Sequence, residues 1–98
     1  MTHQEKAAAT DRLRRALSTF QTAQNHVLSA ERRLKGLPQA EVDAFWDGPG
    51  RRVEATVRAA AAAAVAAFQQ FSAAGLVAAA SDRHLVTQAQ RYLAEGAA

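Results

Sequence analysis

The three histidines are the side chains of this sequence whose chemistry would matter most if they came together. His3, His26 and His84 share no metal-ligand spacing with one another or with acidic residues on one helical face. Ser81, Asp82 and His84 are close in sequence, but neighbours on one helix point in different directions and cannot assemble a catalytic triad. We therefore expect no metal site and no nucleophilic catalysis.

The glycine-rich segment Gly48-Pro49-Gly50 is the other place where a reactive site could be sought. A phosphate-binding loop requires a lysine and a longer stretch, and this segment has neither. The carboxylates are scattered, and nothing indicates a concave site that would shift their pKa values. The chain has no cysteine, which excludes disulfides and thiolate chemistry. The pattern does not indicate an enzyme, and no cofactor is expected.

Length and composition indicate one helical domain, residues 1–98, with a thin hydrophobic core. Of the 98 residues 49% are hydrophobic, but aromatic residues make up only 6% and alanine is the commonest residue. Alanine is the best helix former, yet each alanine buries little surface. A core of this kind usually needs support from a partner chain.

A heptad pattern predicts a first long helix over about residues 3–35. Thr2 and Glu5 have the spacing of a capping box at its start, and Gly36 and Pro38 are suited to end it. Large apolar residues recur at every seventh position, with alanines between them, which is typical of a seam between packed helices. The large seam residues are Leu13, Phe20, Val27 and Leu34, and the small ones are Ala16, Ala23 and Ala30.

The only tryptophan lies near the middle of the chain, within a predicted short helix and turn over about residues 38–50. Gly48 can take a positive φ, and Pro49 fixes φ near the helical value. Proline lacks a backbone N–H, but the first turn of a helix does not use that hydrogen-bond donor. We expect the chain to reverse at this turn motif, with Trp46 covering the end of the hairpin.

A second long helix is predicted over about residues 51–94, with a weak point near residues 75–82. Gly75 would permit a bend, and Ser81 or Asp82 could cap a separate last helix, although one continuous helix is the preferred interpretation. Its seam again alternates bulky and small residues. The large seam residues are Val57, Phe68, Phe71 and Leu85.

Further apolar residues lie beside the two seams and are expected to face a partner, because a two-helix hairpin has only one internal face. A standard interface would bury about 1,600 Å². The predicted fold is therefore all-α: an antiparallel helix-turn-helix hairpin with heptad seams, whose further apolar stripes bury against another chain. The predicted partner-facing residues are Leu17, Leu28, Val86 and Leu93.

Basic residues gather on both sides of the central turn, at Arg32-Arg33-Lys35 and Arg51-Arg52, and the formal net charge is +3. Such a collar is usually a solvated surface, while the alternative is contact with nucleic acid or acidic lipid. No aromatic residue is interleaved with the arginines for stacking on bases, which argues against nucleic acid. No apolar run is long enough for a secretory signal or a membrane span.

Three features together resemble the WXG (Esx-like) family of small helical hairpins associated with type VII secretion. They are the central Trp46 and Gly48, an amphipathic heptad helix on each side, and the absence of cysteine, secretory signal and catalytic residues. The resemblance implies a hairpin that pairs as a homodimer or heterodimer into a four-helix bundle. It also implies an export signal at Tyr92 and Glu95, although the acidic residue comes one position earlier here than in the family. The interruption at residues 36–38 is a second departure.

The preferred hypothesis is an Esx-like secretion substrate or partner chaperone that binds another helical hairpin. It would be cytoplasmic before export and secreted without a Sec signal. The alternative is a structural coiled-coil subunit of a larger assembly, such as a phage or bacterial particle, and the third hypothesis is a basic bundle that binds nucleic acid. None of these needs a small-molecule substrate or a membrane span. The identity of the partner, the oligomeric state and export itself stay open at this point.

Overall fold

The computed structural model describes residues 2–96, and within that range every regular element is a helix. Four helices follow one another along the chain: α1 (His3–Leu34), α2 (Gln39–Asp47), α3 (Gly50–Ala73) and α4 (Ala80–Gly96). The prediction of an all-α fold is confirmed for the described residues. The molecule is elongated, with extents of 55 × 24 × 20 Å.

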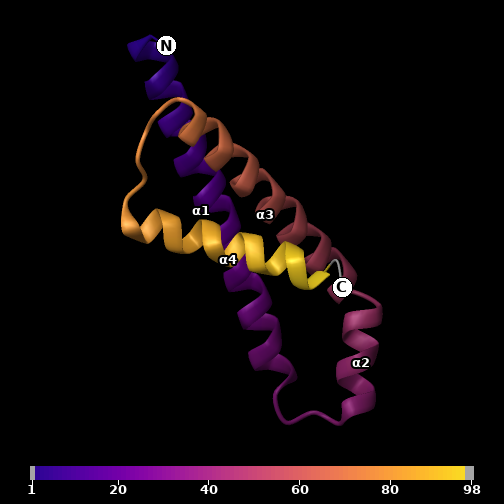
Figure 1. The fold of residues 1–98 in the computed structure, drawn as a ribbon. Helices are drawn as coiled ribbons and strands as arrows, with labels where there is room; N and C mark the ends of the chain where they lie inside the picture. The colour runs from indigo at the N-terminus through magenta and orange to yellow at the C-terminus, as the bar shows by residue number, and fades with distance from the viewer. Residues whose placement is uncertain (1, 97–98) are drawn as a thin grey trace.

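The two longest helices, α1 and α3, lie side by side and run in opposite directions (Figure 1). α4 crosses over this pair and packs mainly on α3, with further contacts to α1 (Figure 1). α2 lies at the end of the molecule where α1 finishes, and its main contacts are with α3. Three helices therefore surround the core, and one short helix lies at its edge.

The start of α1 is fixed by its capping box. The Thr2 hydroxyl accepts a hydrogen bond from the Glu5 backbone N–H at 3.1 Å, and the Glu5 carboxylate accepts one from the Thr2 N–H at 3.3 Å. Two otherwise unpaired donors are satisfied in this way. The capping box predicted from the spacing of Thr2 and Glu5 is confirmed.

The core is built where α1, α3 and α4 meet, and small side chains make up much of it. Phe20 is fully buried among alanines of α3, and Phe71 is buried near the far end of the same helix. Val27, Phe68 and Leu85 are half-buried against this core, and Leu34 is half-buried at the end of α1. The buried core consists of Leu13, Leu17, Phe20, Ala23, Val57, Ala60, Ala61, Ala64, Ala67, Phe71, Ala78, Val86 and Ala89.

The chain reverses between α1 and α2, and not at the Trp46 turn as the sequence had suggested. Gly36 takes a φ of 86°, which favours glycine, and Pro38 then opens α2. Gly48 has a φ of −114°, and its N–H bonds back to Ala44 and Phe45 at the end of α2. α2 and α3 both run toward the end of the molecule where α1 begins (Figure 1). The expectation of a positive φ at Gly48 and a reversal there is therefore wrong, and that segment only bends the chain.

The predicted continuous second helix is also wrong, because the chain breaks between α3 and α4. Gly75 has a φ of 78°, its N–H donates to the Ser72 carbonyl at 2.9 Å, and the Leu76 N–H donates to Phe71 at 3.4 Å. This pair of bonds is the Schellman motif, which ends a helix at a left-handed glycine. Residues 76–79 then form a link without regular structure, in which Val77 is 85% exposed.

The break lets α4 fold back, and this changes which apolar residues remain for a partner. Leu17 is only 3% exposed and Val86 only 2%, so the prediction that these two face another chain is wrong. α4 covers the α1–α3 pair itself and buries both side chains within one molecule. Leu93 is half-buried against the same core, while Leu28 remains 47% exposed.

Gly50 opens α3 under the ring of Trp46, and only glycine fits there. A Cβ at this position would lie 2.5 Å from Trp46 Cε3 and 2.9 Å from the Phe45 carbonyl oxygen. Neither contact is possible without displacing a bulky ring and the backbone of α2. The indole therefore holds the junction between α2 and α3 by packing on a bare Cα.

We predict that Gly50→Ala lowers the free energy of unfolding by about 1–3 kcal/mol, because the added methyl group overpacks the junction. At an unstrained helical site the same change would raise stability by about 0.4–1 kcal/mol. Urea unfolding measures the effect, and Trp46 emission should change in the folded variant. Gly75→Ala is the matched control: it should lose stability through its φ of 78° but leave the emission unchanged. A stabilised Gly50→Ala protein would contradict the proposed packing.

Candidate protein-binding groove

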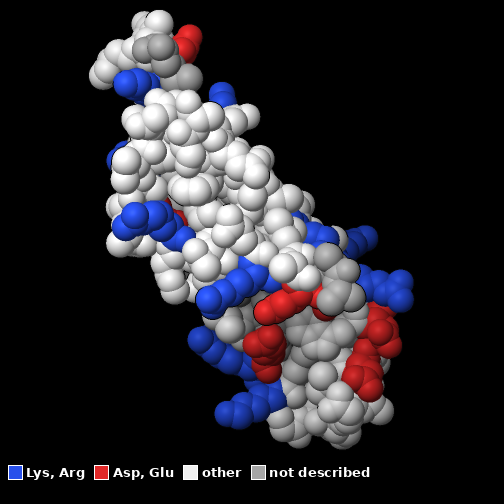
Figure 2. Space-filling model, viewed as in Figure 1, with Lys and Arg blue, Asp and Glu red and all other residues white. Residues whose placement is uncertain are grey.

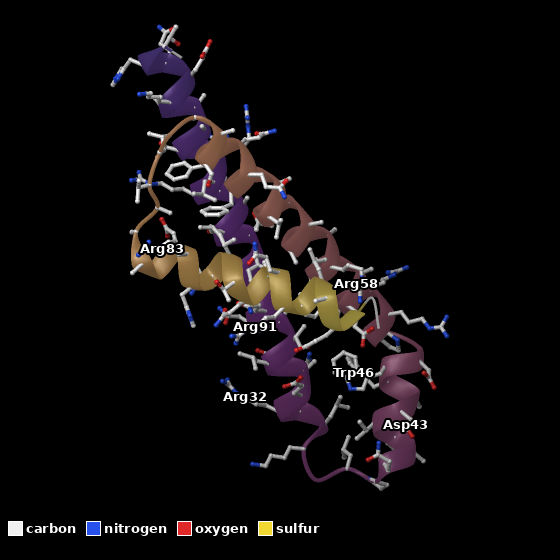
Figure 3. The ribbon with its side chains drawn as sticks, viewed as in Figure 1. Arg32, Asp43, Trp46, Arg58, Arg83 and Arg91 are labelled. Atoms are coloured by element: carbon white, nitrogen blue, oxygen red, sulfur yellow. The ribbon has the colours of Figure 1, made fainter. Side chains whose placement is uncertain are left out.

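An apolar groove of about 350 Å³ lies between the last turns of α1 and α2. From α1 it is lined by Leu28, which is 47% exposed, and by the half-buried Leu34. From α2 it is lined by Val42 and Trp46, both half-buried, and Figure 3 shows Trp46 beside the space that separates the two helices. None of the nine residues of α2 is fully buried. The groove is thus an open apolar surface with large side chains on both walls.

The position of Trp46 follows from its neighbours. Its ring meets the Phe45 ring edge-on, with centroids 5.0 Å apart and an angle of 84° between the planes. Edge-to-face pairs of this kind stabilise aromatic contacts. With Gly50 close to the ring and Phe45 at its edge, the indole is fixed while part of it remains open to the groove.

The α1 wall of the groove also carries charge. Arg32 and Lys35 line the groove, together with Glu31. Within the described residues the one ion pair is elsewhere on α1, between Arg15 and Asp11 at 3.0 Å. Figure 2 shows Lys and Arg side chains spaced along one long edge of this face of the molecule. The groove therefore combines an apolar floor with an exposed basic edge.

A second groove, of about 500 Å³, lies between α1 and α4 and is more polar. Gln24 on α1 donates to the Gln88 amide oxygen at 3.2 Å, and the Gln88 amide nitrogen lies 3.0 Å from His84 Nε2. This hydrogen-bonded chain connects α4 to α1 across the groove. Three of its polar side chains, Gln24, His84 and Gln88, are thus bonded to one another and help to hold α4 on α1.

The two residues predicted as an export signal have different surroundings. Tyr92 packs on α3, where its hydroxyl donates to the Glu54 carbonyl at 3.4 Å and Arg58 lies 5.5 Å from its ring centroid. Glu95 is exposed, one turn further along α4. Burial raises the pKa of Tyr92 above 10.0; Arg58 lowers this pKa, and Glu54 raises it further. Tyr92 thus helps to hold α4 in place.

The described residues, 2–96, form no metal-binding cluster. No group of three or more histidine, cysteine or acidic residues there could hold a metal ion. No helix of that range has the length and hydropathy needed to cross a membrane. The α1–α2 groove, which Leu28 and Trp46 line, is the candidate binding surface.

Sequence reasoning missed the site because it assigned the groove residues to other roles. Leu34 was assigned to the seam, Leu28 to a partner face, and Trp46 to the end of a hairpin. Gly36 and Pro38, which separate the groove walls, indicate the end of one helix and the start of a short one, and this pattern alone does not bring the two walls together. The signal that could have identified the groove was the cluster of large apolar residues on both sides of this glycine–proline break.

No protein-family model, curated protein or solved structure matches this chain. The resemblance carried by Trp46 and Gly48 therefore remains an expectation from the sequence. Function has to be argued from the groove and the surface described above.

We predict that Tyr92 makes stability fall at alkaline pH. Folding raises the pKa of Tyr92 above its unfolded-state value of 10.0. The stability that the neutral Tyr92 side chain contributes is therefore complete below that value and is lost as pH rises through the folded-state pKa. Urea unfolding at about pH 8 and about pH 11 should show this loss in the wild type and a smaller loss in Tyr92→Phe. Equal losses of unfolding free energy in the two proteins would show that the Tyr92 hydroxyl does not contribute to this pH dependence.

Proposed function

We propose that this protein acts by binding another helical chain, and that the groove between α1 and α2 receives it. The observation that carries this proposal is the cluster of Leu28, Leu34, Val42 and Trp46, which lines an open apolar groove between α1 and α2. Large apolar side chains gathered in an exposed groove are typical of a surface that receives an amphipathic helix. The groove has no catalytic group in it.

The narrower proposal is an Esx-like (WXG) substrate or partner chaperone of type VII secretion, as a homodimer or heterodimer. Its support is the Trp46–Gly48 pair, the helical layout and Tyr92 with the exposed Glu95 near the end of α4. The reversal at Gly36 departs from the family pattern, in which the tryptophan motif lies at the hairpin turn. Under this proposal the chain is cytoplasmic before export and leaves the cell without a Sec signal.

We predict that the protein pairs at micromolar concentration and that Leu28→Lys disperses the pair. Removing a buried leucine from an interface costs about 2 kcal/mol, and burying an ammonium group adds to that cost. Because Leu28 is 47% exposed within one chain, the variant should keep its fold. Sedimentation velocity measures the pairing, and circular dichroism checks the helices.

The matched control is Ala63→Lys, which places the same charge on an exposed position of α3 and should leave pairing unchanged. A folded wild-type monomer at micromolar concentration would exclude self-pairing. A pair that Leu28→Lys does not weaken would exclude the groove as its site. Rings, filaments or higher oligomers would instead favour a structural subunit of a larger assembly.

Export is tested in a host with a type VII secretion system. Glu95→Ala should abolish release of the protein into the culture supernatant, because Glu95 belongs to the proposed export signal. The residue is exposed, so its loss does not alter the core. Tyr92→Ala should do the same, but this variant also removes packing on α3, so its folding must be checked. Wild-type protein that stays inside the cells would contradict the narrower proposal and leave helix binding unaffected.

A further inference from the structure

We propose that the helix bound in the α1–α2 groove is an acidic one, selected by Arg32 and Lys35. This inference rests on the proposed function, because it concerns the occupant of the same groove. Both cations line the groove beside Leu28 and Trp46, and both side chains are exposed. Neither is in an ion pair with another described residue. A partner can therefore supply the missing counter-charge.

The two cations lie at the end of α1, where both line the groove. Arg32 belongs to the last turn of α1, and Lys35 is the C-cap residue that follows Leu34. Carboxylates three or four residues apart on a second helix share one face of that helix and can contact both cations. Glu31 is the one acidic residue on the same wall, which leaves two cations against one carboxylate.

The surrounding charges orient the acidic face of the partner toward α1. Arg83 and Arg91 of α4 follow the same long edge of the molecule as Arg32, so they extend the basic edge beyond the groove (Figure 3). The α2 wall of the groove is apolar, and the three acidic residues of α2 lie outside the groove lining. These are Glu41, Asp43 and Asp47.

The apolar floor of the groove distinguishes a helix from a nucleic acid as its occupant. An amphipathic helix carries an apolar stripe that can bury Leu28, Leu34 and Trp46, whereas a phosphate backbone has no such stripe. The cations alone would suit either partner. Cations beside an apolar groove favour a helix with an acidic flank.

Trp46 gives a direct measurement, because it is the only tryptophan of the chain and lines the groove. Two designed helical peptides, free of tryptophan and tyrosine, share one leucine stripe and carry glutamates or lysines beside it. The glutamate peptide should shift Trp46 emission to shorter wavelength and bind about tenfold more tightly than the lysine peptide. Its advantage should shrink with added salt, which screens exposed charges.

Charge reversal in the protein completes the test. Arg32→Glu with Lys35→Glu should reverse the order of the two peptides. Lys6→Glu with Arg14→Glu changes the net charge equally at exposed positions on the first half of α1, and this control should preserve the order. Circular dichroism establishes that both variants remain helical.

Equal binding of the two peptides, or an unchanged order in the Arg32/Lys35 variant, would overturn charge selection while leaving helix binding in place. A short DNA fragment that displaces the glutamate peptide at physiological salt would overturn it in favour of nucleic acid. Failure of both peptides to shift Trp46 would overturn it as well. In that last case the sedimentation experiment with Leu28→Lys decides separately whether the groove binds a helical chain.

Discussion

Close packing of alanine against neighbouring helices is the interaction on which this structure depends. α3 buries Ala60, Ala61, Ala64 and Ala67 in the core that it shares with α1 and α4. Small side chains let helices approach closely, but each contributes little apolar area. Two helices joined in this way would leave much of their seam exposed. A third helix is therefore needed, and α4 provides it within the same chain.

The direction of α4 explains why the groove exists at all. α4 crosses the α1–α3 pair instead of running along it, so its cover does not extend to the end where α2 lies (Figure 1). The last turns of α1 then face α2 across the groove, and α2 packs mainly on α3, so Leu28 and Leu34 are not fully buried. The apolar residues excluded from the alanine core thus collect at one end. The basic edge lies beside them because Arg32 and Lys35 share those same turns with Leu28 and Leu34.

The sequence carried enough information for local structure and too little for the path of the chain. A heptad pattern and a capping box depend on neighbours a few residues away, which is why the start of α1 and its buried residues Leu13 and Phe20 were predictable. The choice between Gly36 and Gly48 for the reversal depends on which backbone takes a positive φ in the folded chain. A break at Gly75 and a continuous helix both agree with the same apolar period. Only tertiary packing decides between them, and with it the burial of Leu17 and Val86 and the position of the groove.

The attachment of α4 by a short link has a consequence for the order in which the chain can fold. α4 packs mainly on α3 and is bonded to Gln24 of α1 and to the Glu54 carbonyl of α3, so its complete docking surface exists only when those two helices have met. Contacts between segments close in sequence form early, so α3 and α4, which only a short link separates, can pair before α1 completes the surface. During synthesis on the ribosome α1 and α3 emerge before α4, so both helices that hold α4 are present when it appears.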